Sequence, residues 1–222
     1  MESTLHRQLK GRYGPESGGR SEVAIGGFRV DAVTAEGRFV EVQMAPLRLL
    51  KAKLAGWLPI HEVAVVRPVI LATRVVRRAS PNGPDLGARR SPRRGSLLDV
   101  FEELIGLADH FPHPRLTIEV VGVDVDEVRV PRRRRPGYSV VDRALRGVLE
   151  AVSLRNPEDL WSLLPVEPDG PFTSEDLASL MGRPIDWGRK VAYCLHRAGA
   201  ARMVGKRGNR RVYATCTPVE VA

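Results

Sequence analysis

The chain has 222 residues, enough for one or two domains with a sizeable core, and 35 Lys and Arg residues outnumber 26 Asp and Glu residues. The formal charge of +9 favours a polyanionic partner, most simply nucleic acid. No apolar run has the ~20 residues of a membrane span, and the amino terminus has no signal-peptide pattern. The presence of only two cysteines argues against a disulfide scaffold or a zinc site. We therefore expect a cytoplasmic protein without membrane contact.

The first third of the sequence predicts an alternation of helices and strands. Residues 3–12 predict a helix with one apolar face, and residues 21–43 predict three short strands. A second helix begins at Pro46 and continues to about Trp57. Its predicted buried stripe comprises Leu47, Leu50, Leu54 and Leu58. Apolar runs over 62–66 and 70–76 then predict two buried strands.

Acidic residues in the three-stranded segment are predicted to lie side by side. The Gly26-Gly27 pair and the loop over 35–37 are typical of tight hairpins, and these loops fix which residues face one another. The acids predicted to share one face are Glu22, Asp31 and Glu41. Opposed like charges destabilise a sheet, and a divalent cation removes that penalty. The alternative is a hairpin with an acidic face that is simply solvated.

The middle of the sequence is strongly basic. Residues 77–95 predict a mobile Arg- and Pro-rich loop that either clamps a phosphate backbone or is a solvated insertion. A helix is predicted over 96–109 and a strand over 116–125, which complete a first domain at residues 1–130. We interpret residues 131–137, with two prolines and four arginines, as a linker between domains.

A second domain is predicted over residues 138–216, followed by a tail at 217–222. Its predicted elements are helices over 139–153, 156–164, 173–181 and 184–198 and a hairpin over 201–214. Several helices followed by a hairpin with a basic tip are typical of a winged helix-turn-helix.

Basic residues are concentrated near the carboxyl end. Residues 183–215 contain nine basic groups and one acidic group, Asp186. The residues expected to contact DNA are Arg189, Lys190, Tyr193 and Arg197 on the last helix and Lys206, Arg207, Arg210 and Arg211 on the hairpin. We expect DNA to be the partner, and a homodimer is also compatible with the sequence. Protein contacts are the alternative role of a winged helix.

Asp31 followed by Glu41-Val42-Gln43 resembles the PD-(D/E)XK nuclease superfamily. The resemblance covers residues 3–76 and includes the order of elements as well as the spacing of the acids. It implies an α/β (α+β) fold with a restriction-endonuclease-like α-β-β-β-α-β core and a mixed sheet, followed here by the small winged-helix domain.

The resemblance also implies a metal site. Asp31 and Glu41 would hold Mg²⁺ or Mn²⁺ with help from the Val42 carbonyl, and the ion would activate a water for attack on a phosphodiester. Glu22 is expected to supply a further acid, because the strand register places it beside Asp31. The implied activity is that of a Mg-dependent DNA endonuclease positioned by the winged helix.

Gln43 stands where the family usually has a lysine. Glutamine orients a water by hydrogen bonding but cannot act as a general base. Lys51 or Lys53, in the following helix, is the expected replacement cation. This departure keeps two other classes open, a non-catalytic DNA-binding regulator with a degenerate nuclease fold and a protein–protein adaptor with a basic surface.

Overall fold

The structure is a computed structural model that describes residues 2–25 and 27–216. The predicted tail at 217–222 and Gly26 of the first predicted turn lie outside the described residues. The chain divides into two compact units, each made of separate segments. Unit 1 comprises Met1–Met44, His61–Leu97 and Glu119–Ala151, and unit 2 comprises Ala45–Ile60, Leu98–Ile118 and Val152–Ala222. This interleaved division differs from the predicted boundary at 131–137.

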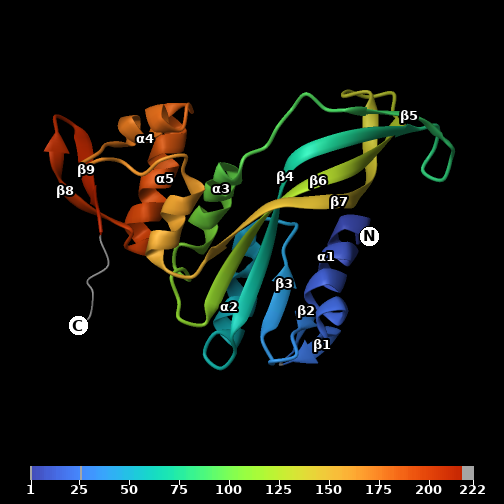
Figure 1. Cartoon of the computed structure of the whole chain (residues 1–222), viewed down its shortest axis with the longest axis horizontal. Helices are drawn as coiled ribbons and strands as arrows, with labels where there is room; N and C mark the ends of the chain where they lie inside the picture. Colours follow the sequence, from blue (N-terminus) through green and yellow to red (C-terminus); the bar gives the residue numbers. More distant parts are fainter. Residues whose placement is uncertain (1, 26, 217–222) are drawn as a thin grey trace. The chain divides into compact units, whose positions relative to one another are not determined.

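A mixed sheet is the main feature of unit 1 (Figure 1). Its strands are β1 (Arg20–Ile25), β2 (Phe28–Val33), β3 (Phe39–Val42), β4 (Val63–Arg78), β5 (Asp85–Arg90), β6 (Leu116–Pro131) and β7 (Tyr138–Leu154). The strand order is β1-β2-β3-β4-β6-β7, and β5 pairs with β4 off this path. The first three strands are antiparallel, whereas β4 runs parallel to β3. The expected mixed α/β (α+β) class is therefore confirmed.

The predicted register of the apolar residues in the first three strands is confirmed, whereas the predicted pairs of Glu22 with Asp31 and of Asp31 with Glu41 are not among the register partners. Val23 pairs with Val30, and Ala32 pairs with Val40, as the lengths of the two loops require. Gly27 adopts a φ of 80°, the left-handed conformation that glycine tolerates without steric cost. The short loops therefore decide which side chains of these strands face one another.

Helix α1 (Thr4–Tyr13) packs against the sheet and is followed by a short turn, η1 (Pro15–Ser17). Leu5 and Leu9 are fully buried, as the predicted apolar face of this helix requires. They belong to a core cluster with Ala32, Val40, Val42, Ala64, Val66, Val121, Val123 and Val125. The same helix reaches β7, because the side-chain oxygen of Gln8 accepts a hydrogen bond from the Leu145 N–H at 2.7 Å.

Three sequence predictions for the middle of the chain are wrong. Residues 139–153 form most of strand β7 and not a helix. Residues 131–137 are the end and turn of the β6–β7 hairpin and not a linker, with the Arg132 N–H donating to the Gly137 carbonyl at 3.0 Å. Residues 77–95 are not a structureless loop, because they include the end of β4 and all of β5. Pairing along long strands outweighs the local pattern in each case.

The remaining helical elements are mostly short. They are η2 (Leu47–Leu50), α2 (Lys51–Trp57), η3 (Leu97–Val100), α3 (Phe101–Leu104), η4 (Ile105–Leu107), η5 (Pro157–Leu163), α4 (Ser174–Leu180) and α5 (Ile185–Ala198). The predicted stripe from Leu47 to Leu58 is buried, so the second predicted helix is confirmed as η2 and α2. Among the described residues, the helices are too short or too polar to cross a membrane.

Helices α4 and α5 pack closely in unit 2. The Thr173 side chain accepts a hydrogen bond from the Asp176 N–H, and the Asp176 carboxylate accepts one from the Thr173 N–H at 2.7 Å, which confirms the predicted capping box. Gly188 of α5 lies against the backbone of α4, since a Cβ built there would be 1.9 Å from the Ser174 carbonyl oxygen. The close packing of α5 on α4 therefore requires glycine at this position.

A β-hairpin follows α5. It is formed by β8 (Ala201–Arg207) and β9 (Arg210–Thr215). Phe172 and Tyr213 exchange backbone hydrogen bonds of 2.8 Å, which attach the segment before α4 to this hairpin. The predicted inward residues Val191 and Leu195 of α5 are fully buried. Of the elements predicted for the carboxyl end, the last two helices and the hairpin are thus present, whereas the predicted first helix is strand β7.

Candidate active site

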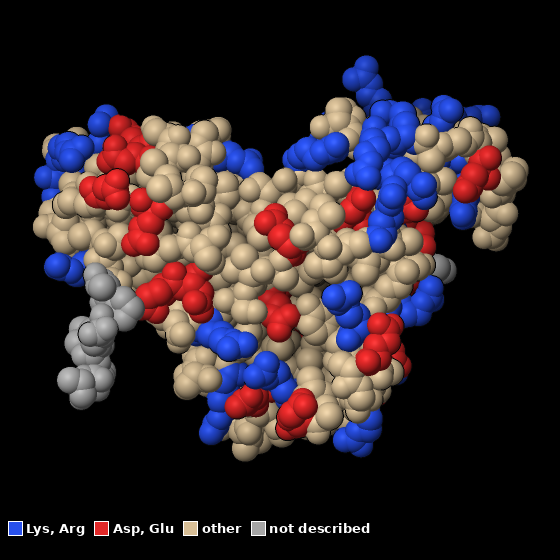
Figure 2. Space-filling model, in the orientation of Figure 1, with Lys and Arg blue, Asp and Glu red and all other residues tan. Residues whose placement is uncertain are grey.

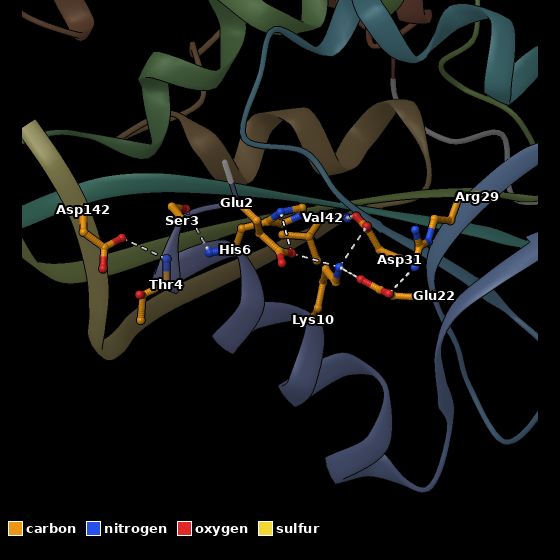
Figure 3. Close-up of polar contacts among 10 residues, drawn as sticks. All are labelled: Glu2, Ser3, Thr4, His6, Lys10, Glu22, Arg29, Asp31, Val42 and Asp142. Carbon is orange, nitrogen blue, oxygen red and sulfur yellow. Dashed lines mark hydrogen bonds and ion pairs between the residues drawn. The ribbon is translucent and has the colours of Figure 1, made fainter.

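A cluster of charged side chains lies where α1 faces β1 and β2 (Figure 3). We call it the acid–lysine cluster, and it comprises Glu2, His6, Lys10, Glu22 and Asp31. The three residues from the amino-terminal segment are four apart, so they share one side of the helix. The apolar side of α1 packs in the core cluster, and the polar stripe beside it contacts Glu22 of β1 and Asp31 of β2.

Asp31 is at the centre of the cluster. Its Oδ2 lies 3.2 Å from His6 Nε2 and accepts a hydrogen bond from the Val42 N–H at 2.9 Å, while Oδ1 lies 3.7 Å from Lys10 Nζ. Burial raises the pKa of Asp31, but the hydrogen bonds from His6 and Val42 and the nearby positive charges outweigh it and hold the pKa below its usual value. Asp31 is therefore a carboxylate at neutral pH.

Lys10 connects the acids of the cluster. Its Nζ lies 2.9 Å from Glu2 Oε1 and 2.8 Å from Glu22 Oε1, in addition to its contact with Asp31. Burial lowers the pKa of Lys10, but the surrounding carboxylates more than compensate and raise it. Glu22 also binds Arg29, and Lys10 followed by Arg29 lowers the pKa of the Glu22 carboxyl.

Two predicted site residues, Glu41 in β3 and Gln43 directly after it, are buried. Glu41 is 5 % exposed and Gln43 is 8 % exposed, whereas the Glu22 side chain is 43 % exposed, so only part of the predicted acidic row faces solvent. The Gln43 N–H donates to the Val66 carbonyl at 2.9 Å, and its own carbonyl accepts from the Arg67 guanidinium at 2.9 Å. These bonds fix the backbone next to Glu41 against β4.

The structure brings the predicted acids together only in part. Glu22 and Asp31 are joined through the Lys10 ammonium, and no group of three or more His, Cys, Asp or Glu residues in the described ranges is arranged to hold a metal ion. Mg²⁺ commonly takes one or two protein carboxylates and keeps several waters. Asp31 and Glu41, the pair expected to bind such an ion, lie on the adjacent strands β2 and β3. The described contacts of the Asp31 carboxylate are with His6, Lys10 and the Val42 N–H.

The two expected replacement cations interact within unit 2. Lys51 Nζ lies 3.5 Å from Asp109 Oδ2, and Lys53 Nζ lies 5.3 Å from the centre of the Trp57 ring. The cation beside Asp31 is Lys10. Sequence reasoning missed it, although the four-residue spacing of Glu2, His6 and Lys10 was a usable signal.

Half of the predicted DNA-contacting residues make ion pairs inside unit 2. The pairs are Arg189 with Asp186, Lys190 with Glu102, Arg197 with Asp109 and Arg210 with Glu175. Lys206, Arg207 and Arg211 of the hairpin form no ion pair with a described residue. The hairpin therefore offers more available positive charge than α5 does.

A groove of about 360 Å³ lies between α4, α5 and the hairpin. Arg189, Tyr193 and His196 line it from α5, and Asn209 and Arg211 line it from the hairpin. Tyr193 is 44 % exposed, so its ring is accessible to a ligand. Arg189 and Tyr193 therefore share a face, as predicted from their spacing.

Comparison with known proteins places the chain in a family. Residues 3–155 match a domain of unknown function (DUF8091). The chain belongs to this family. An uncharacterized protein of Treponema pallidum (strain Nichols) is 34 % identical over 217 residues, which are 96 % of this chain and 84 % of that protein. No solved structure matches the chain.

The DUF8091 match contains the acid–lysine cluster and the strands that carry it. Helices α4 and α5 and the carboxyl-terminal hairpin lie beyond the matched residues. The similarity to the Treponema protein extends over both parts.

Proposed function

We propose that this DUF8091 protein cleaves phosphodiester bonds in nucleic acid at the acid–lysine cluster. The observation that carries the proposal is the Lys10 ammonium, 3.7 Å from the Asp31 carboxylate, in a chain with Gln43 in place of the usual lysine of the PD-(D/E)XK pattern. Support also comes from the sheet, in which three antiparallel strands are followed by β4 parallel to β3. This arrangement resembles the nuclease core implied by the sequence.

Two side chains of the cluster, together with Glu41 and Gln43 of the neighbouring strand segment, have distinct roles in this proposal. Asp31 and Glu41 would hold a divalent ion, which supplies Lewis-acid chemistry and lowers the pKa of a bound water. The Gln43 amide would orient the attacking water by hydrogen bonding. Lys10 would stabilise negative charge that develops on the phosphate, the role that Gln43 cannot take.

Unit 2 would hold the nucleic acid. Its helices and hairpin resemble a winged helix, and the hairpin residues Lys206, Arg207 and Arg211 are suited to phosphate contacts. Arg189 and Tyr193, which line the groove, would contact bases or sugars with limited sequence preference.

A plasmid-nicking assay with Mg²⁺ or Mn²⁺ tests the proposal. We expect cleavage by the wild-type chain and a loss of at least about 100-fold in Asp31→Asn and Glu41→Gln, because each change removes a charged oxygen ligand. Lys10→Gln should lower the rate by about 10- to 100-fold, since it removes a single charge.

The matched control is Asp85→Asn, which makes the same chemical change at an exposed residue of unit 1 that pairs with Arg78. Cleavage at the wild-type rate by this control is required. Equal cleavage by the wild type, Asp31→Asn and Glu41→Gln would rule out the acid–lysine cluster as the catalytic centre.

A specific observation favours a second candidate, a non-catalytic nucleic-acid-binding protein. The Asp31 carboxylate is already balanced by Lys10, His6 and the Val42 N–H, so the cluster is also plausible as a purely structural network. Salt-dependent DNA binding with no metal-dependent cleavage, at any Mg²⁺ or Mn²⁺ concentration tested, would select this candidate.

A further inference from the structure

A second groove lies in unit 1, apart from the acid–lysine cluster. Its volume is about 390 Å³, within the ~300–1,000 Å³ typical of small-molecule sites. Its apolar lining comes from Val75, Leu86, Val130, Pro131 and Pro136, with Tyr138 beside them. Four arginines, Arg77, Arg78, Arg89 and Arg129, also line it.

The strand register explains one wall of the groove. Val75 of β4 pairs with Arg89 of β5, so the two side chains share a face of this hairpin. Arg77 is two residues beyond Val75 and therefore lies on that same face. Arg78 is held by Asp85 at 2.6 Å, whereas Arg77 and Arg89 form no ion pair with a described residue.

The opposite wall carries an aromatic ring and a guanidinium in contact. The Arg129 guanidinium lies over the Tyr138 ring at 3.9 Å from the ring centre. Glu127 fixes Arg129 at 2.7 Å and also binds Arg143 at 2.9 Å. Burial raises the pKa of Glu127, but its two arginines outweigh burial and lower it, so it stays charged and keeps Arg129 in place.

The groove combines surfaces that match the two parts of a nucleotide, its base and its phosphate. An apolar lining next to the stacked Tyr138 and Arg129 suits the face of a nucleobase, which stacks on aromatic and guanidinium planes. Arg77 and Arg89, at the other wall, suit a phosphate, which arginine binds through paired hydrogen bonds. Lys and Arg atoms gather over this end of unit 1, around β5 and the β6–β7 turn (Figure 2).

We propose that this groove binds one nucleotide unit, with its base against Tyr138 and its phosphate between Arg77 and Arg89. The unit belongs either to a single strand of nucleic acid or to a free mononucleotide, and both share this chemistry. The inference does not depend on cleavage at the acid–lysine cluster.

Fluorescence anisotropy with a labelled single-stranded oligonucleotide tests the groove. The full chain is used with Arg207→Gln and Arg211→Gln, so that the hairpin of unit 2 contributes little to binding. We expect Arg77→Gln with Arg89→Gln to weaken binding at least about 10-fold and to reduce the salt slope by about 1.4, as two lost phosphate contacts require. Tyr138→Leu should weaken binding at least about fivefold by removing a stacking surface.

The matched control removes two exposed arginines from the same region outside the groove. Arg93→Gln with Arg133→Gln should weaken binding less than about threefold, because it lowers the net charge equally but leaves the groove intact. An equal loss in both double variants, or no loss in either, would overturn the proposal.

Competition identifies the ligand. AMP should displace the oligonucleotide at lower concentration than inorganic phosphate or adenosine, because only AMP offers both base and phosphate. Displacement by AMP alone at concentrations similar to those of a short oligonucleotide would assign a free mononucleotide, and much better displacement by the oligonucleotide would assign a strand. Equal displacement by phosphate and AMP would contradict a nucleotide site.

Discussion

Lys10 is the residue on which the acid–lysine cluster depends, because its ammonium lies within 4 Å of three carboxylates. The residue is only 8 % exposed, so water cannot fully replace it as a partner for those acids. A buried lysine surrounded by carboxylates costs desolvation energy and specifies one arrangement of neighbours. Here that arrangement fixes α1 over β1 and β2 and keeps Asp31 ionised.

At the residue scale, the capping box before α4 gives a prediction with a defined pH dependence. Hydrogen bonds from the Thr173 N–H and hydroxyl lower the pKa of Asp176 below its usual value of 3.8. A lowered carboxyl pKa stabilises the folded state above the unfolded pKa, and this contribution is lost as pH falls through the folded pKa. We expect Asp176→Ala to lower the free energy of unfolding by about 1 kcal/mol near neutral pH and by less at an acidic pH below the lowered pKa of Asp176.

Urea unfolding of both proteins at the two pH values measures this difference. Asp169→Ala, in an exposed loop of the same unit, is the control and should leave stability unchanged within about 0.5 kcal/mol. A stability loss that is the same at both pH values would assign the effect to helix propensity and not to the carboxylate.

At the scale of elements, the contact between α4 and α5 predicts intolerance of a single methyl group. A Cβ at Gly188 would lie 1.9 Å from the Ser174 carbonyl, which is backbone and cannot rotate away. We expect Gly188→Ala to destabilise unit 2 by about 2 kcal/mol or more and to lower its thermal midpoint by several degrees, as overpacking does. Circular dichroism during heating measures the shift.

Gly205→Ala provides the matched control for this experiment. Its Cβ would have no atom within 4 Å, so the same substitution should change stability by less than about 0.5 kcal/mol. Equal thermal midpoints for the Gly188 variant and the wild type would mean that α5 does not pack this closely against Ser174 of α4.

The elements also show what local sequence can predict. Glycine-containing loops fix the register of β1, β2 and β3, and the leucine stripe identifies η2 and α2, because short-range geometry decides both. The same reasoning gives a wrong prediction for residues 139–153, because Val140, Val141, Leu145 and Val148 match a helical period. Their strand conformation is decided by pairing with β6, which no local pattern reveals.

The candidate site was predictable to a similar extent. Glu22 and Asp31 were predicted to be neighbours from register, and both contact Lys10 in the structure. The predicted position of Glu41 beside Asp31 stays a prediction. Lys10 and His6 come from a helix distant from Asp31 in sequence, and their contact depends on how α1 packs. Lys51 and Lys53 were predicted to replace the missing lysine because they are close to Gln43 in sequence. Closeness in sequence is a poor guide to closeness in space.

At the scale of the whole molecule, most of the net positive charge is concentrated in one segment of the sequence. Residues 183–215 account for +8 of the formal +9. For DNA binding, Arg207→Gln with Arg211→Gln should reduce the slope of log affinity against log salt by about 1.8, because two phosphate contacts are lost. Duplex titrations at several salt concentrations measure this slope.

Arg12→Gln with Arg20→Gln removes the same charge from exposed positions in unit 1. This control should change the slope by less than about 0.3 if binding is local to the hairpin. Equal changes in both double variants would show that overall charge, and not the hairpin, controls the affinity.

The hydrogen bond between Gln8 and Leu145 gives α1 a second structural role, which is to cover part of the edge of β7, the last strand in the strand order. An open strand border attracts the borders of other chains, and here part of that border is closed by the helix that supplies Lys10 and His6. Unfolding of the first turns of α1 would disrupt the acid–lysine cluster. It would also expose the edge of β7, where another chain could pair. Disruption of the acid–lysine cluster and self-association of the chain would then have the same structural cause.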